Sequence, residues 1–193
     1  MKYTQIPQDT FRNLQMNAGI LVTDFDPTDG SVEGLMGATT GGMSFNAAPE
    51  YSDFGEDIDN CPKNTKELKK LMDWGVTMSG TFVSVTKDLA KTLTAVADVD
   101  SKDATHIIPR SDLLTTDFTD IWLVGDYSDV NTGANAGFLA IHLMNALSTG
   151  GFSIQTGDKA KGNFAFEFTG HYSLDAQDTV PFEIYVKQGT VTP

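Results

Sequence analysis

Alternation of apolar with polar or small residues is the feature that most limits what this chain can fold into. Residues 163–172 carry large aromatic side chains at every second position: Phe164, Phe166, Phe168 and, four places on, Tyr172. Because successive side chains of a β-strand point to opposite faces, this pattern predicts a strand with one buried aromatic face and one wet face. Similar alternations at 41–48, 74–85 and 180–186 predict further strands, so we expect a mainly β fold.

The chain's length bounds how these strands are organised. It has 193 residues, 40% of them hydrophobic, which suffices for one domain with a real core. Residues 1–18 have no clear period and mix polar with single apolar residues, so we expect an N-terminal arm. We interpret residues 19–193 as a single β-rich domain.

One helix is expected among these strands. Thr86 is a suitable N-cap for a helix over 87–97, in which Leu89, Leu93 and Val96 form an apolar stripe. Further strands are expected at 19–25, 31–36, 105–108, 121–127 and 138–147. The last is apolar on both faces, as expected of a central strand beneath the helix.

Residues 49–66 lack either period and are rich in Asp, Asn, Gly and Pro, which predicts a long loop. The charged residues in the first part of this segment are all acids. Those that follow are lysines with a single acid among them. Adjacent blocks of opposite charge favour recognition between identical copies, although a solvated loop with incidental charge is an equal alternative. The candidate self-assembly residues are three apolar side chains with the charged ones around them: Tyr51, Asp53, Phe54, Glu56, Asp57, Ile58, Asp59, Lys63, Lys66, Lys69 and Lys70.

Several functional classes lack support in the sequence. The net charge of -13 disfavours capture of nucleic acid or anionic lipid, and no stretch approaches the roughly 18 apolar residues of a membrane span. Cys61 is the only cysteine, and the three histidines are far apart in sequence, so we expect no metal centre, although a cation at the acidic part of the loop stays an alternative. No nucleophile or phosphate-loop motif occurs, so we expect no enzymatic activity and no cofactor.

Long segments of the chain resemble a known family. They read PEYSDFGEDIDNCPKNTKELKKL, WGVTMSGTFVSVT, GFLAIHLMNALSTGGFSIQTGDKAKGNFAFEFTGHYS and PFEIYVKQG. Together they resemble the major tail protein, or tail tube protein, of long-tailed phages and prophages of Gram-positive bacteria. The resemblance runs from FRNLQMNAGILV onward and rests on overall sequence and not on a short motif.

The resemblance implies a β-sandwich or barrel-like tail tube fold with one flanking α-helix, a long loop and an N-terminal arm. Six copies would form a ring, and stacked rings would form the tube of the virion tail, with no membrane involved. The protein would be made in the host cytoplasm, and its partners would be further copies and the tape-measure, tail terminator and distal tail proteins. DNA would pass through without tight binding, along a lumen lined by one sheet of every copy. Candidate lumen-facing residues are the small or polar ones on strand faces: Ser44, Asn46, Thr77, Ser79, Thr81, Asn163, Glu167 and Thr169.

A soluble β-sandwich carbohydrate-binding module is the competing interpretation. The chain has two Trp, five Tyr and twelve Phe residues, and aromatic side chains also suit a sugar-binding face. Most of them occupy positions that the alternation assigns to the core. Saturable sugar binding by a monomer would favour this alternative, whereas tube formation would exclude it.

Overall fold

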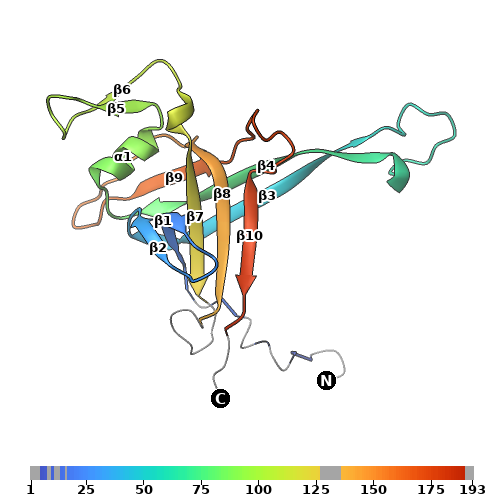
Figure 1. Ribbon diagram of the computed structural model, residues 1–193, viewed down its shortest axis with the longest axis horizontal. Helices are drawn as coiled ribbons and strands as arrows, with labels where there is room; N and C mark the ends of the chain where they lie inside the picture. The colour runs from blue at the N-terminus through green and yellow to red at the C-terminus, as the bar shows by residue number, and fades with distance from the viewer. Residues whose placement is uncertain (1–4, 8–9, 11–13, 16, 127–135, 190–193) are drawn as a thin grey trace.

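The computed structural model describes residues 5–7, 10, 14–15, 17–126 and 136–189, and this part of the chain is mainly antiparallel β (Figure 1). It confirms the expected mainly β fold and contains one α-helix within the described ranges. The helix is α1 (Lys87–Thr94), and short 3-10 turns cover Lys66–Leu68 and Thr115–Asp117. The strands are β1 (Ile20–Phe25), β2 (Val32–Leu35), β3 (Thr39–Asp53), β4 (Lys69–Phe82), β5 (Ala97–Val99), β6 (Ile107–Pro109), β7 (Thr119–Asp126), β8 (Phe138–Ser148), β9 (Phe164–Thr169) and β10 (Phe182–Lys187).

Strand β8 joins two parts of one sheet. The order is β2-β1-β7-β8-β9-β4-β3, and β10 also pairs with β8. Residues 138–143 of β8 pair with β10, whereas Leu147 and Ser148 pair with β9. Between these segments Asn145 has a φ of 47°, its backbone N–H donates to Asp120 Oδ1 (2.9 Å), and its Nδ2 donates to the His171 carbonyl (3.1 Å). These bonds hold the irregular backbone where β8 changes partner.

The core lies between the two parts of the sheet. Leu21, Ile121 and Leu143, on β1, β7 and β8, belong to the same buried cluster as the apolar face of β4 and β9. That face consists of Val76, Met78, Phe82, Phe164, Phe166 and Phe168, all at most 6% exposed. The predicted aromatic core face is therefore confirmed.

Helix α1 covers one end of this core. The Thr86 hydroxyl accepts a hydrogen bond from the Leu89 N–H (3.2 Å), which confirms the predicted N-cap. Leu89 and Leu93 are buried, and the Ser148 hydroxyl at the end of β8 donates to the Leu93 carbonyl (2.9 Å). The helix thus packs over β8 as the sequence predicts.

The predicted end of the helix, at residue 97, is wrong. The helix ends at Thr94, because Ala95 has a φ of 65° and leaves the helical conformation. The Val96 carbonyl then accepts from the Arg110 N–H (2.9 Å), and Ala97 begins β5. A tertiary contact with a segment 14 residues further on ends the helix. Helix propensity depends on the local sequence and therefore does not predict such a contact.

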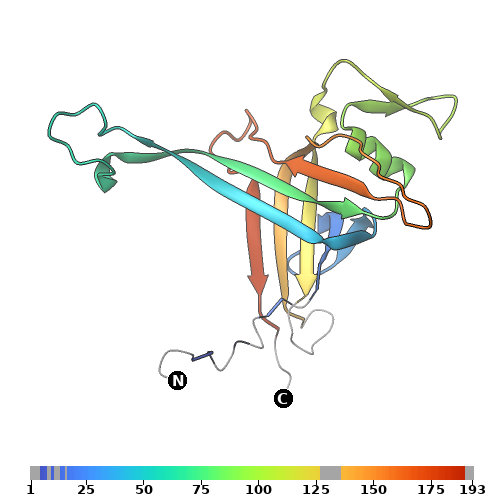
Figure 2. The same cartoon turned by 180° about the vertical axis from the view of Figure 1, so that it is seen from behind.

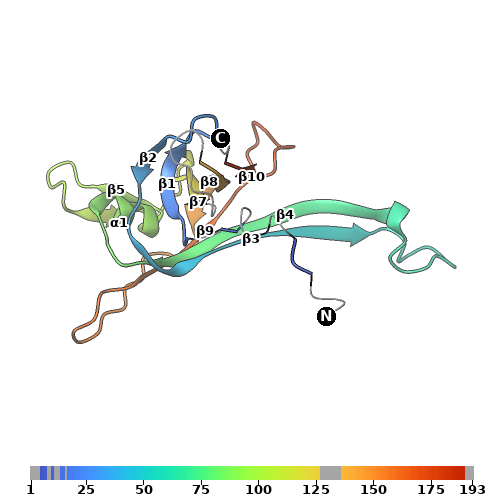
Figure 3. The ribbon, with the colours of Figure 1, turned by 90° about the horizontal axis from the view of Figure 1, so that it is seen from below.

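The predicted loop at 49–66 is also partly wrong. Pro49–Asp53 belong to β3, which pairs with β4 as far as Asp53 opposite Lys69. The two strands form a hairpin whose outer half projects far from the body (Figures 2 and 3). We call this outer half, residues 49–74, the arm, as distinct from the N-terminal arm expected at residues 1–18. A proline normally argues against a strand, yet Pro49 is tolerated because β3 is the edge of its sheet.

The packing predicts that substitutions at two neighbouring residues of β9 differ clearly in their effect on the free energy of unfolding. Phe168→Ala should lower the free energy of unfolding by about 3–5 kcal/mol, because Phe168 is fully buried and its loss leaves a cavity. Glu167→Ala, on the exposed face of the same strand, should cost less than about 1 kcal/mol. Urea denaturation followed by circular dichroism measures both. Equal costs would contradict the assignment of the two faces.

Candidate functional site

The structure brings the predicted lumen-facing residues of three strands onto one sheet face. In the β3-β4-β9 part of the sheet, Asn46 lies opposite Thr77, which lies opposite Thr169 on its other side. The adjacent row on this face is Ser44, Ser79 and Glu167, and Thr81 lies opposite Ala165 in the next. Because residues opposite one another share a face, these side chains form one continuous polar face, which we call the polar face.

Hydrogen bonds extend the polar face beyond β9. The Thr149 hydroxyl is 2.8 Å from the Thr169 hydroxyl and donates to Glu167 Oε1 (3.2 Å). Asn163 lies just before β9 and exchanges backbone hydrogen bonds with Gln155 (2.8 and 2.9 Å). By its spacing from Ala165 and Glu167 it falls on the same face. Sequence reasoning missed Thr149, because no alternating pattern surrounds it.

The polar face continues onto the arm, where it becomes acidic. Ala48 lies opposite Gly75, and Glu50 lies opposite Asp73. Two carboxylates directly opposite one another repel. Sequence reasoning assigned Glu50 to an acidic loop and did not place Glu50 or Asp73 on this face, because their pairing depends on recognising that β3 reaches residue 53.

The opposite face of the arm is apolar as far as Tyr51 and Leu71, ends in the charged pair Asp53 and Lys69, and has no second sheet over it in the described residues. Near the body, Trp74 and Phe45 pack against Phe182 of β10, with ring centroids 5.3 and 5.7 Å apart. Further out on the same face Tyr51 lies opposite Leu71, and Met72 occupies a bulge beside them. Their exposed fractions are 57%, 41% and 58%. Sequence reasoning found Tyr51 but missed Leu71 and Met72, which follow a run of lysines.

The tip of the arm is a structured turn and not an open loop. Asp53 Oδ1 accepts from the Gly55 N–H and Oδ2 from the Asn64 N–H, both at 2.9 Å, and the Phe54 N–H donates to the Leu68 carbonyl (3.0 Å). The backbone N–H groups of Gly55 and Asn64 lower the pKa of Asp53 below its ordinary value of 3.8, because they favour the charged carboxylate.

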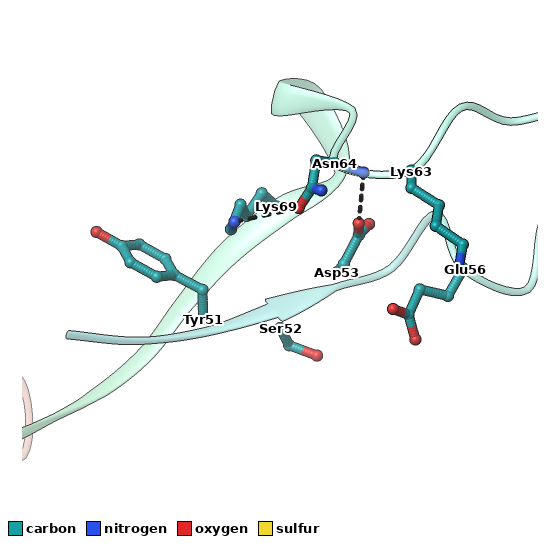
Figure 4. Close-up of a pocket in the computed structure, with 7 residues that line it drawn as sticks. All are labelled: Tyr51, Ser52, Asp53, Glu56, Lys63, Asn64 and Lys69. Atoms are coloured by element: carbon teal, nitrogen blue, oxygen red, sulfur yellow. Dashed lines mark hydrogen bonds between the residues drawn. The ribbon is translucent and has the colours of Figure 1, made fainter.

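Figure 4 shows the depression that surrounds Asp53. It has a volume of about 500 Å³ and lies between the ends of β3 and β4. Lys69 Nζ lies 5.3 Å from the centre of the Tyr51 ring and donates to Asn64 Oδ1 (3.5 Å). The lining residues are Tyr51, Ser52, Asp53, Glu56, Lys63, Asn64 and Lys69.

The predicted self-assembly residues all lie on the arm, but not all on a loop. Tyr51 and Asp53 belong to β3, Lys69 and Lys70 belong to β4, and Lys66 lies in a 3-10 turn. Lys66 pairs with its neighbour Glu67 at 3.4 Å, and within the described ranges this is the one ion pair of the arm. The remaining predicted residues lie on the tip, where all of them are exposed: Phe54, Glu56, Asp57, Ile58, Asp59 and Lys63.

The histidines occupy separate places in the fold. His106 lies near Asp100, and His171 Nδ1 lies 3.2 Å from the Asn145 carbonyl. His142 stacks on Trp122 with ring centroids 4.0 Å apart and lies 3.2 Å from Asp120. In the described part of the chain no group of three or more His, Cys, Asp or Glu residues is placed to hold a metal ion. No helix there has the length and apolar character needed to cross a bilayer.

A comparison of the chain with models of protein families found no match, and a comparison with curated proteins also found none.

The Asp53 hydrogen bonds predict that the tip responds to acid. Since its pKa is lowered in the folded chain, the carboxylate stabilises the tip above pH 3.8, and this contribution is lost as pH falls through the lowered value. Asp53→Asn should speed amide hydrogen exchange at Gly55 and Asn64 at neutral pH, because a neutral amide is a weaker acceptor. Asp57→Asn, on the same tip, is the matched control. Equal exchange in both variants would show that Asp53 does not hold the turn.

Proposed function

We propose that this chain is a structural protein that assembles into hexameric rings, which stack into the tail tube of a phage virion. The observation that carries the proposal is the division of one hairpin into two contrasting faces. Within the body, β3 and β4 cover the core with one face and expose small polar side chains on the other. Beyond the body, the core-covering face continues without a cover in the described residues.

Two features of the single copy favour association with further copies. Strand β3 is 15 residues long and forms the edge of its sheet, so its outer backbone groups have no strand partner among the described residues. A long open edge of this kind is a template for pairing with another chain. Tyr51, Leu71 and Met72 add exposed apolar surface next to it, and contact with another copy would remove that surface from water.

The polar face suits the wall of a channel. Its side chains in β3 and β4 are hydroxyls and an amide, which solvate easily and provide no basic groove for phosphate. Its charged members are the acids Glu167, Glu50 and Asp73 and, further out on the arm, Lys70 opposite Ser52, and the chain as a whole carries -13. Such a surface repels DNA, and a conduit must let DNA pass without holding it.

The competing interpretation as a carbohydrate-binding module draws little support from the two tryptophans, whereas Tyr51, Phe54, Phe152 and Tyr172 are each more than 40% exposed. Trp122 is 7% exposed and stacked on His142, and Trp74 packs against Phe182. A sugar-binding face needs exposed aromatic rings. The two tryptophans are therefore engaged in contacts within the chain.

Assembly without a cofactor is the first expected outcome. Concentrated pure protein should form rings and tubes, which negative-stain electron microscopy and light scattering detect. Raising salt from about 50 mM to about 500 mM should weaken assembly if charge pairs dominate, and should leave it level or strengthen it if Tyr51, Leu71 and Met72 dominate. A species that stays monomeric at every concentration and salt would contradict the proposal, and saturable sugar binding by that monomer would establish the alternative.

The position of the polar face in the tube can be tested by chemical labelling. With Cys61→Ser as background, a cysteine introduced as Ser44→Cys should react with a bulky maleimide polymer in the monomer, because Ser44 is exposed. In intact tubes the reaction should slow at least about tenfold, since the polymer enters only through the tube ends. Lys102→Cys, at an exposed position between β5 and β6, is the control for the outer surface. Equal labelling of both positions in tubes would place the polar face outside.

A further inference from the structure

A depression lies on the body, beside the start of the arm. It has a volume of about 490 Å³, within the range of about 300–1,000 Å³ that small-molecule sites occupy. Three segments far apart in the sequence line it: the turn before β7, the irregular point of β8, and the chain between β9 and β10. We call it the Tyr172 pocket. Its lining includes Thr115, Phe118, Asn145, His171, Tyr172 and Asp175.

Contacts within the chain hold the inner wall of the Tyr172 pocket in place. Asn145 Nδ2 donates to the His171 carbonyl (3.1 Å), and His171 Nδ1 lies 3.2 Å from the Asn145 carbonyl. The Phe118 ring meets the His171 ring edge to face, with centroids 5.2 Å apart. The wall is therefore formed before a ligand binds, and a preformed site loses little conformational entropy on binding.

Tyr172 supplies an aromatic ring that is held at one end and still open to solvent. Its hydroxyl oxygen accepts a hydrogen bond from the Trp74 N–H of β4 (3.0 Å). The residue nevertheless stays 41% exposed, and Leu174, next to it in the lining, is 87% exposed. The pocket thus has an apolar surface on which a ligand ring can stack.

Three polar groups of the pocket have no hydrogen-bond partner within the described part of the chain. They are the Thr115 hydroxyl, the Asp175 carboxylate and Nε2 of His171. Because the Asn145 carbonyl can only accept, Nδ1 of His171 carries a hydrogen, which leaves Nε2 of the neutral ring as an acceptor. Two acceptors and one hydroxyl therefore stand ready for a ligand that carries hydroxyl groups.

The charge of the pocket narrows the class of ligand. No lysine or arginine lines it, and Asp175 is its one acidic residue. A phosphate or carboxylate would meet this carboxylate without a cation to compensate it. A wholly apolar ligand would remove polar groups from water without replacing their hydrogen bonds. A neutral sugar ring meets both conditions, because it has C–H groups on its faces and hydroxyls around its rim.

We propose that the Tyr172 pocket binds a neutral saccharide, with the sugar ring on Tyr172 and its hydroxyls donating to Asp175 and to Nε2 of His171. This binding function goes beyond the proposed function and is independent of it. No residue of the polar face lines the pocket, and neither do the exposed apolar residues of the arm, Tyr51, Leu71 and Met72.

Titration followed by nuclear magnetic resonance tests the proposal. Nitrogen-15-labelled protein, at a concentration below that of assembly, is titrated with methyl β-glucoside, methyl β-galactoside and N-acetylglucosamine, each to about 50 mM. At least one sugar should shift the amide signals of Trp74, Asn145 and Tyr172 in a saturable way. The dissociation constant should be on the order of 1–10 mM, since one sugar ring buries little surface. Saturable binding by none of the three would overturn the proposal.

Two substitutions at Tyr172 separate the ring from its hydroxyl. Tyr172→Ala should weaken binding of the best sugar at least about tenfold, because the stacking surface is lost. Tyr172→Phe keeps the ring and loses only the bond to the Trp74 N–H, so binding should stay within about threefold of the unchanged protein. Circular dichroism checks that both variants are folded. An equal loss in both would contradict stacking on the ring.

The carboxylate of the pocket has a matched control in the same segment. Asp175→Asn should weaken binding at least about threefold, because a sugar hydroxyl loses a charged acceptor. Asp178→Asn makes the same change of charge at an exposed position that does not line the pocket, and it should leave binding unchanged. Equal effects of the two substitutions would show that Asp175 does not contact the sugar.

A quaternary ammonium ion is the alternative ligand, since it also binds beside aromatic rings and a carboxylate. Tetramethylammonium chloride is therefore titrated in parallel with the sugars. Binding of this cation at least about tenfold more tightly than of each sugar would overturn the proposal in favour of a cation site.

The outcomes keep this proposal separate from the proposed function. If the protein forms tubes and binds none of the sugars, the saccharide site is wrong and the tube assignment stands. If it binds a sugar through Tyr172 and also forms tubes, both are supported. Sugar binding by a protein that stays monomeric at every concentration and salt would support the site and contradict the tube.

Discussion

Backbone pairing between β3 and β4 is the interaction on which the rest of this structure depends. Strand β4 is hydrogen-bonded on both sides, to β3 and to β9, and its face toward the core contributes Val76, Met78 and Phe82. Because the side-chain period of a strand is two, a shift of one residue in this pairing would move the buried residues to water and the polar face inward. Burial of the core face therefore fixes the register, and the register places every residue of the polar face.

The same pairing carries strand structure beyond the body, where no second sheet covers it. Antiparallel strands satisfy one another's inner backbone groups, so the hairpin continues as far as Asp53 and Lys69. An isolated two-stranded ribbon is marginal in water. The Asp53 carboxylate, bonded to the Gly55 and Asn64 amides, closes its end. What this extension leaves exposed is the continuation of the core face, and that exposed surface is the strongest physical argument for association with other copies.

Strand pairing brings charged residues together that do not form a block in the sequence. The sequence shows an acidic block followed by lysines at 50–70, and the simplest interpretation is that the two blocks meet between copies. The structure adds a second acidic surface at Asp24 and Glu33, which the sequence presents as part of an ordinary turn. Residues 49–74 carry seven acids and four lysines, and Asp53 lies directly opposite Lys69, so the charges of the arm are mixed along its length.

The sequence by itself determined the class of fold and the alternating faces of its strands. The aromatic face of 164–168, the N-cap at Thr86 and the central strand at 138–147 are local patterns. They follow respectively from burial of apolar side chains at a period of two, from the side-chain hydrogen bond that Thr86 accepts at the helix start, and from apolar residues on both faces. The grouping of Ser44, Asn46, Thr77, Ser79, Thr81, Glu167 and Thr169 on one face follows once β3, β4 and β9 pair. The tertiary structure alone decided which strands pair, that Pro49–Asp53 extend an edge strand, that α1 ends at Thr94, and that Leu71 and Met72 stay uncovered. These depend on contacts between segments far apart in sequence, such as β3 with β4 and Arg110 with Val96, whose free energies no local pattern records.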